Sequence, residues 1–223
     1  MKYLFILLGL IGGGAWIFAY VLIVYKGLKD KTYGMPLIPL VLNFSYEFIY
    51  SFCHPVNILF NIPWFLLDLG IVYTYFKYGY PYFNKFYFIK KRQWYLISIF
   101  TFIAGFLITF FTHQFFSQNL TTIPNEQISV ILGFIWVLFI PTCLTIMFFQ
   151  RKNIEGQSFL ISFLILIGTF SYIIQILSDP LFINCVSPLL ILLNVLSIII
   201  AIYHNRLLYR QLVRKGLNPW KTF

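Results

Sequence analysis

Two acidic residues lie inside long apolar stretches of the sequence, where ionisable side chains are uncommon. Glu47 is in the apolar run that follows Met35, and Asp68 is near the middle of the run that ends at Tyr78. A carboxylate in a hydrocarbon layer costs roughly 2.5–3.5 kcal/mol on insertion scales, so such a residue normally faces a protein interior and has a function there. The remaining acidic residues lie in stretches that read as loops: Asp30, Glu126, Glu155 and Asp179.

The spacing of the two acids predicts that they meet. Glu47 lies roughly 10 Å below the outer end of its helix, at 1.5 Å per residue counted from His54. Asp68 comes from the next, antiparallel segment, at roughly 8–16 Å from the same end. A buried carboxylic acid that keeps its proton can be a general acid, and it can also carry a proton through a transporter. One acid alone would serve equally well as a hydrogen-bonding group between helices.

The neighbours of the acids add polar and aromatic groups to the same place. Asn43 and Tyr50 share the helix face of Glu47, at four residues before it and three after it. Trp64 and Tyr75 lie on the side of Asp68. These residues predict a pocket that opens toward the outer half of a membrane.

Seven apolar segments can carry these residues across a bilayer. The chain is 60% hydrophobic and 10% charged, whereas soluble domains are about one quarter charged. A membrane-spanning helix needs roughly 20 apolar residues. The sequence therefore predicts an all-α integral membrane protein, a single domain over residues 1–223, with seven transmembrane helices: Tyr3–Tyr25, Met35–Cys53, Ile58–Tyr78, Gln93–His113, Ile128–Phe149, Ser158–Leu177 and Leu181–His204.

The basic residues predict the orientation. Of the 16 Lys and Arg residues, all except Lys2 fall in alternate connections, at the adjacent end of the third segment or in the C-terminal tail. Cytoplasmic loops collect Lys and Arg, so the N-terminus is expected outside and the C-terminus in the cytoplasm, in a bacterial inner membrane or the endoplasmic reticulum. The net charge of +10 then reflects orientation and attraction to anionic membrane lipids. We expect no nucleic-acid partner.

Metal and disulfide chemistry have little support in the sequence. Cys53, Cys143 and Cys185 are an odd number without paired spacing, so neither a metal site nor a disulfide framework is expected. Cys53 and Cys185 lie near the outer ends of their segments and are the pair that could join. We expect no cofactor. An Asp-rich cluster that would ionise a diphosphate is also absent from the sequence.

The region from about residue 25 to 80 resembles the membrane-bound terpene cyclases of fungal meroterpenoid and indole-diterpene pathways. The stretch 30–36, followed by Asn43 and 46–50, is similar to the motif of that family's second helix, with Tyr46 where Trp is usual. The stretch 64–73 resembles the third helix of the family. Outside this region the agreement is in length, number of spans and topology.

The resemblance implies a reaction and its residues. A polyprenyl chain, often epoxidised and attached to an aromatic or heterocyclic head, is protonated, and a carbocation cascade then closes fused rings without a metal. Glu47 and Asp68 match catalytic acids of the family. Aromatic faces can stabilise passing cations by about 1–2 kcal/mol each when desolvated. The expected substrate-binding residues, with Trp136 as a further aromatic candidate, are Asn43, Tyr46, Tyr50, Trp64, Tyr73 and Asn194.

One departure from the family concerns the last helix, which usually carries another catalytic Asp. The seventh segment here has no acid, and its central polar residue is Asn194. Asp179 precedes that segment, but between Ser178 and Pro180 it reads as a helix N-cap. We therefore expect that Asp68 has the second acidic role or that the chemistry differs.

Two other classes remain open on the residues alone. A small proton-coupled transporter would use the same two acids, Glu47 and Asp68. A receptor or sensor is the second alternative, but a retinal protein is excluded because the seventh segment has no Lys. For a cyclase, the expected partners are a lipophilic prenylated small molecule and membrane lipids, with a prenyltransferase and an epoxidase acting upstream.

Overall fold

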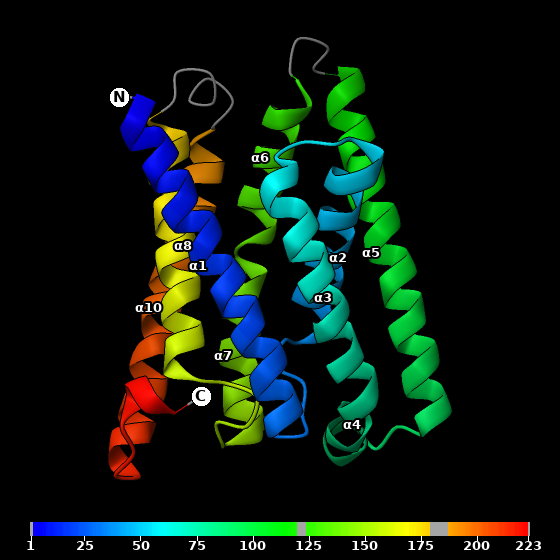
Figure 1. The fold of residues 1–223 in the computed structure, drawn as a ribbon. Helices are drawn as coiled ribbons and strands as arrows, with labels where there is room; N and C mark the ends of the chain where they lie inside the picture. The colour runs from blue at the N-terminus through cyan, green and yellow to red at the C-terminus, as the bar shows by residue number, and fades with distance from the viewer. Residues whose placement is uncertain (1, 120–123, 179–186, 223) are drawn as a thin grey trace.

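The chain folds into a bundle of long helices with short connections (Figure 1). The computed structural model describes residues 2–119, 124–178 and 187–222. Within these residues there is no β-strand. The elements are α1 (Lys2–Lys29), α2 (Leu37–Phe48), the π-helical turn η1 (Ile49–Cys53), α3 (Ile58–Tyr78), α4 (Tyr80–Tyr87), α5 (Lys91–Asn119), α6 (Asn125–Trp136), α7 (Phe139–Arg151), α8 (Phe159–Leu177), α10 (Pro188–Arg214) and the 3-10 turn η2 (Pro219–Lys221).

Six stretches of helix are long and apolar enough to cross a membrane, as a multi-pass protein requires. They are α1, α3, α5, the combined α6 and α7, α8 and α10. The second predicted segment forms α2 and η1, a shorter apolar helix of residues Leu37–Cys53. The third segment has the predicted bounds, Ile58–Tyr78.

The fifth predicted segment is not one continuous helix. It is divided between α6 and α7 at Val137 and Leu138. Pro141 has no backbone N–H, so it cannot donate to the carbonyl of Val137 four residues earlier. Instead, the Ser197 hydroxyl of α10 donates to the Val137 oxygen at 3.2 Å. The Val137 carbonyl at the break therefore joins α6 and α7 to α10 through this hydrogen bond.

The seventh predicted segment has the wrong bounds. α10 begins at Pro188, where the Ser187 hydroxyl accepts a hydrogen bond from the Leu190 amide at 3.3 Å. Serine at the N-cap and proline at the first helical position are the usual start of a helix. α10 also continues to Arg214, well beyond His204. Residues 179–186, which include Asp179 and Cys185, lie outside the described residues, and so does the predicted cap at Asp179.

Close packing of α1 brings the two sides of the bundle together. In Figure 1, α1 crosses the front, packed against α8 on one side and α3 on the other. A Cβ atom at Gly12 would lie 3.3 Å from the Gly168 carbonyl, so glycine allows α1 and α8 to approach closely. On the other side, α2 packs between α3 and α5.

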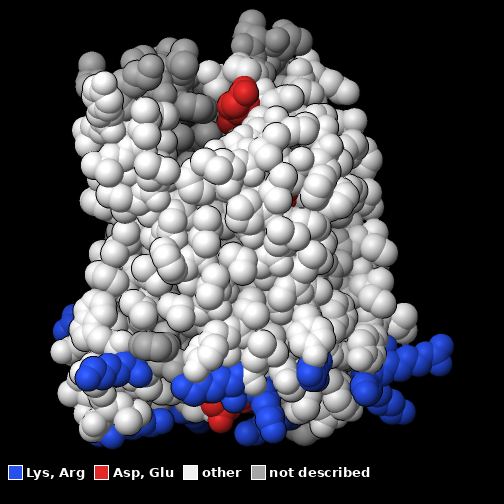
Figure 2. Space-filling view, in the orientation of Figure 1, with Lys and Arg blue, Asp and Glu red and all other residues white. Residues whose placement is uncertain are grey.

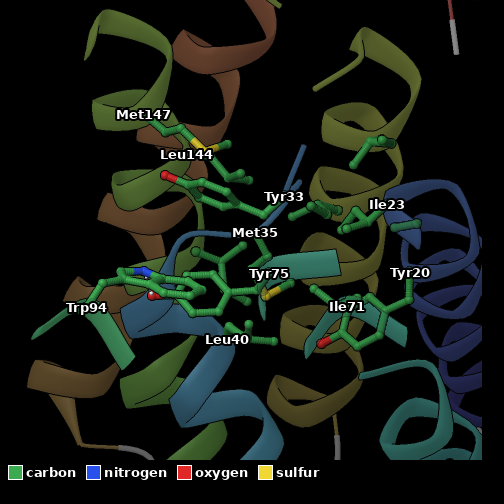
Figure 3. Close-up of a cluster of buried hydrophobic side chains, with 14 residues drawn as sticks. Tyr20, Ile23, Tyr33, Met35, Leu40, Ile71, Tyr75, Trp94, Leu144 and Met147 are labelled. Atoms are coloured by element: carbon green, nitrogen blue, oxygen red, sulfur yellow. Dashed lines mark hydrogen bonds between the residues drawn. The ribbon is translucent and has the colours of Figure 1, made fainter. Parts of the chain in front are cut away.

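The two ends of the bundle differ in packing and charge. Figure 3 shows a buried cluster in which Ile23 of α1, Tyr75 of α3, Trp94 of α5 and Met147 of α7 converge. The Trp94 indole N–H donates to the Tyr75 hydroxyl at 3.1 Å. On the face shown in Figure 2, the Lys and Arg side chains form a band around one end of the molecule. The opposite end, where α1 starts, carries the cavity described below (Figure 1).

Candidate active site

Glu47 and Asp68 lie side by side in the interior of the bundle. Glu47 is 3% exposed and Asp68 is fully buried, and the two carboxyl groups are close enough to interact directly. The Tyr20 hydroxyl of α1 donates to Glu47 Oε1 at 3.2 Å. The same hydroxyl accepts a hydrogen bond from the Asn43 amide. Three helices, α1, α2 and α3, therefore build this polar cluster.

The cluster has more acceptors than donors. In the described part of the chain, Glu47 Oε2 and both carboxyl oxygens of Asp68 lack a hydrogen-bond donor. No described Lys or Arg forms an ion pair with either acid. Ionised carboxylates only accept hydrogen bonds, so the two groups can bond to each other only if one of them carries a proton. A proton shared between Glu47 and Asp68 would supply a missing donor and remove the repulsion of two like charges.

The helix that carries Glu47 changes its winding immediately after it. α2 ends at Phe48, and η1 has the wider π-helical turn from Ile49 to Cys53. The His54 amide accordingly bonds to the Ile49 carbonyl, five residues earlier, at 2.8 Å. Single π-helical turns inside α-helices are frequent at functional sites. Here the turn lies between the acid and the end of its helix.

Glu47 forms part of the wall of a cavity of about 410 Å³. This volume is in the range of small-molecule sites. Helices α1, α2, α3, α6, α7 and α8 contribute to the wall. Most of the surface is apolar, and its aromatic side chains are Phe5, Trp16, Tyr20, Tyr46, Phe60, Trp64, Trp136 and Tyr172. At the end where α6 starts, the wall is polar, with Asn57, Glu126 and Gln175.

The predicted site residues fall into two groups. Asn43, Tyr46, Glu47 and Trp64 line the cavity, as does Trp136. The Tyr46 hydroxyl is tied to α6, because it donates to the Ser129 carbonyl at 3.2 Å. Asp68 lies behind Glu47 and does not itself form part of the wall. The sequence thus placed both acids and part of the wall together.

Two predicted substrate-binding residues, Tyr73 and Asn194, lie away from the cavity wall. Tyr73 is 52% exposed on the outside of α3, and its hydroxyl accepts from Lys77 at 2.6 Å. Asn194 is buried, but it donates to the carbonyls of Phe134 and Leu190, so it joins α10 to α6. A buried amide in this position holds two helices together by hydrogen bonds. We therefore leave Tyr73 and Asn194 out of the proposed site.

Tyr50 belongs to a separate buried cluster near the outer end of α2. Its ring contacts that of Tyr46, with centroids 4.6 Å apart, and its hydroxyl lies 3.0 Å from His113 Nδ1. The His113 ring is in turn stacked on His54 at 3.9 Å between centroids. Tyr50 thus supports Tyr46 from behind rather than lining the cavity. The imidazole pair links the ends of α2 and α5.

Sequence reasoning missed the contribution of α1. Tyr20 and Trp16 line the cavity, and the backbone of Gly12 and Gly13 forms part of its wall. A Cβ atom at Gly13 would lie 2.3 Å from the Phe60 ring of α3. The run from Gly12 to Gly14 was a usable signal, because small residues in membrane helices mark close approach of a neighbour. The partner of that approach could not be read from the sequence.

No cluster of three or more His, Cys, Asp or Glu residues suited to a metal is present in the part of the chain described here. Cys53 and Cys143 are free thiols. Metal-independent chemistry stays a prediction from the sequence. The polar groups that face the cavity include the carboxyl groups of Glu47 and Glu126, hydroxyls and amides. These groups can donate a proton, orient a small molecule and accept hydrogen bonds from it.

The fold and the site define the class: this is a multi-pass helical membrane protein with a buried carboxyl pair beside an aromatic cavity. The model of the Pyr4-like transmembrane terpene cyclases matches residues 1–212. The chain therefore belongs to this family, as the resemblance in the sequence suggested.

Three relatives are similar over a short region. The Pyr4-family terpene cyclase mfmH of Annulohypoxylon moriforme is 40% identical over 70 residues, which are 30% of this chain and 29% of that protein. Terpene cyclase atmB of Aspergillus flavus is 40% identical over 71 residues, again 30% of this chain and 29% of that protein. Terpene cyclase pyr4 of Aspergillus fumigatus is 36% identical over 73 residues, or 30% of each chain. The matches thus span under a third of these relatives' lengths. No solved structure matches the chain.

Proposed function

We propose that this protein is a membrane-bound terpene cyclase that protonates a polyprenyl chain and cyclises it through carbocations. The observation that carries the proposal is the pair of buried, neighbouring carboxyl groups of Glu47 and Asp68, of which Glu47 lines an aromatic cavity. Family membership supports it. The substrate class is a lipophilic prenylated aromatic or heterocyclic compound, with an epoxide or an alkene at the far end of its prenyl chain. A prenyltransferase and an epoxidase would supply it.

In the proposed mechanism, Glu47 is the general acid. The proton shared with Asp68 is transferred from the Glu47 carboxyl to the epoxide oxygen, or to a terminal alkene carbon. With the epoxide, the C–O bond breaks as the nearest alkene attacks the carbon, and each ring closure moves the positive charge along the chain. The last cation loses a proton, so the product is an isomer of the substrate. Tyr20 positions Glu47 through its hydrogen bond and does not itself supply the proton.

The cavity wall supports this chemistry in two ways. Six helices surround the cavity with mostly apolar side chains, which limits the access of water that would otherwise capture the cation before the rings close. The faces of Trp16, Tyr46, Phe60, Trp64 and Trp136 are available to stabilise positive charge as it moves. Each desolvated cation–π contact contributes about 1–2 kcal/mol.

We also propose that α2 with η1 is a seventh span, with the N-terminus outside and the C-terminus in the cytoplasm. The segment is 17 residues long, at the lower limit for a spanning helix. Figure 1 supports the proposal, because α2 runs beside α3 within the bundle. The Lys and Arg band at the end away from the cavity supports the orientation (Figure 2). The membrane would be a bacterial inner membrane or the endoplasmic reticulum.

The function is tested with membranes that contain the protein. They are incubated with an epoxidised prenyl-arene and with its plain alkene counterpart, with and without a chelator. We expect cyclic products of unchanged mass from at least one substrate, and an equal yield when the chelator is present. Product formation only from a prenyl diphosphate, or activity lost with the chelator, would contradict the proposal. Passage of an unchanged solute across vesicles, driven by a proton gradient, would indicate the transporter instead.

A further inference from the structure

A second cavity lies at the basic end of the bundle, away from the carboxyl pair. It encloses about 440 Å³ where the α1–α2 connection, the end of α3, helix α4 and the segment after α7 meet. Its charged residues are four basic and one acidic: Lys31, Lys77, Lys85, Arg151 and Glu155. We refer to these five residues and the space between them as the basic cleft. The proposed reaction does not use these residues.

Arg151 provides a fixed positive charge in the wall of the basic cleft. Only 8% of the residue is exposed, and its guanidinium lies between two rings, 4.1 Å from the centroid of Tyr33 and 4.4 Å from that of Tyr82. Nη1 donates to the backbone oxygens of Tyr33 at 3.1 Å and Glu155 at 2.8 Å. In the described part of the chain, Nε and Nη2 have no hydrogen-bond partner. The charge is thus held in place without a neutralising carboxylate.

The acidic groups near the basic cleft are already engaged. The Tyr82 hydroxyl donates to Glu155 Oε2 at 2.8 Å. Burial raises the pKa of that hydroxyl above its ordinary value, so Tyr82 stays a donor to Glu155. Asp30 pairs with Lys26 at 3.0 Å and accepts from the Gly156 amide at 2.9 Å. The cleft therefore keeps an excess of positive charge.

The three lysines surround the cleft from different elements. Lys31 comes from the α1–α2 connection, Lys77 from the end of α3 and Lys85 from α4. Lys77 donates to the Tyr73 hydroxyl, and Lys85 lies over the Phe86 ring at 5.8 Å. Hydrogen bonds to a neutral hydroxyl and contacts with rings leave both charges uncompensated. Proteins usually bind phosphate with ammonium and guanidinium groups that surround it.

The position of the basic cleft suggests which phosphate it meets. The basic residues of the cleft come from the end of the bundle at which Figure 2 shows the Lys and Arg side chains of one face. In the proposed orientation this end is cytoplasmic and at the depth of the lipid headgroups, which bind in basic pockets between membrane helices. α4 adds aromatic side chains of the kind found at membrane interfaces, including the exposed Tyr87. We propose that the basic cleft binds the phosphate of an anionic membrane lipid.

Native mass spectrometry of the purified full-length chain tests this proposal. The protein is titrated with phosphatidylglycerol and, separately, with phosphatidylcholine, whose headgroup is neutral overall. The test variant is Lys31→Gln/Lys77→Gln/Lys85→Gln, which leaves Arg151 and its structural bonds intact. We expect one phosphatidylglycerol to be retained in preference to phosphatidylcholine, with at least about tenfold weaker retention in the variant, since each basic residue near an anionic headgroup contributes roughly fivefold.

A matched variant distinguishes a site from general surface charge. Arg210→Gln/Arg214→Gln/Lys215→Gln removes three positive charges from exposed positions at the end of α10, and we expect retention close to that of the unchanged protein. Equal losses in both variants would overturn the proposal. Retention of inorganic phosphate without a preference for phosphatidylglycerol over phosphatidylcholine would also overturn it, because the ligand would then be a free anion. A cleft variant that retains its fold, judged by its thermal unfolding, and still binds phosphatidylglycerol normally would do the same.

Discussion

At the residue scale, the proposed proton transfer depends on the small number of hydrogen-bond donors around the Glu47 and Asp68 carboxyl groups. Glu47 has one hydrogen bond, from Tyr20, and Asp68 has none from the described protein groups. Burying a polar group without a partner costs roughly 1–3 kcal/mol. A proton between the carboxyls would reduce this cost, and in the proposed mechanism it is the proton that Glu47 delivers as the general acid.

Glu47→Gln tests the proton donor directly. The amide keeps the size of the side chain and can still accept from Tyr20, but it has no acidic proton to give. A positioned general acid contributes about 10²–10⁴ in rate, so we expect turnover to fall at least that far. Turnover is measured at equal protein level in membranes, with Tyr203→Phe, an exposed change on α10, as the control. Normal turnover of Glu47→Gln would show that the mechanism is wrong.

Asp68→Asn tests the second acid. We expect a loss of about 10² or more, because the neighbour that shares the proton with Glu47 becomes a neutral amide. Expression should hold, since the change removes a buried ionisable group. Asp179→Asn, outside the described residues, should be mild, because Asn caps a helix nearly as well as Asp. An inactive Asp179→Asn together with an active Asp68→Asn would identify Asp179 as the second acid.

At the element scale, three local irregularities shape the cavity. The π-helical turn η1 follows Glu47, and the break before Pro141 separates α6 from α7. On the side of α1 that faces the cavity, glycines leave the backbone without side chains. Each of them interrupts the regular helix geometry or leaves out a side chain, and so leaves space between neighbouring helices. Aromatic rings fill part of this space. Phe60, for example, lies over Gly13 and is stacked on Trp64 with centroids 5.6 Å apart.

Adjacent glycines of α1 offer a matched pair of variants. In Gly13→Ala, the new Cβ would meet the Phe60 ring at 2.3 Å, so the ring must move within the cavity wall. We expect a stability loss of about 1–3 kcal/mol and a disproportionate change in turnover or product pattern. In Gly14→Ala, nothing lies within 4 Å of the new atom, so stability should be unchanged or higher, by up to about 1 kcal/mol. Thermal unfolding and product analysis compare the two. Identical product profiles at equal stability would show that Gly13 does not shape the cavity.

At the scale of the whole molecule, charge and chemistry are separated along the bundle. The polar mouth of the cavity, with Glu126, is at one end, and the basic cleft with Arg151 is at the other. Figure 3 shows the buried cluster around Tyr75 and Trp94, which lies between the helices. This division fits the proposed orientation, in which the basic end faces the cytoplasm and the cavity opens toward the opposite half of the membrane.

Cysteine labelling tests the proposed topology. Single cysteines at Gln118, near the end of α5, and at Asn84, in α4, are introduced after Cys53, Cys143 and Cys185 have been changed to Ser. Both positions are exposed. An impermeant thiol reagent added to sealed membranes should label the Gln118 position from outside, and the Asn84 position only after permeabilisation. Labelling of both positions from one side would contradict the seven-span arrangement.

The sequence by itself determined the membrane class, the bounds of some helical segments and the meeting of Glu47 with Asp68. These follow from local costs: an apolar run of about 20 residues has no stable place in water, and a carboxylate inside it needs a protein interior. The bounds of α3 and the pairing of Glu47 with Asp68 could be derived in this way. The motif between residues 25 and 80 also indicated the family that the comparison with residues 1–212 confirmed.

Only the tertiary structure decided which side chains complete the site. Helices that are apolar all round have no preferred face, so the sequence could not show that Tyr20 points at Glu47 while Tyr73 points away from the bundle. The carbonyl that Asn194 binds belongs to Phe134, 60 residues earlier. Such contacts depend on how helices rotate and approach one another. That arrangement is set by packing across the whole bundle, and no local stretch of sequence contains it.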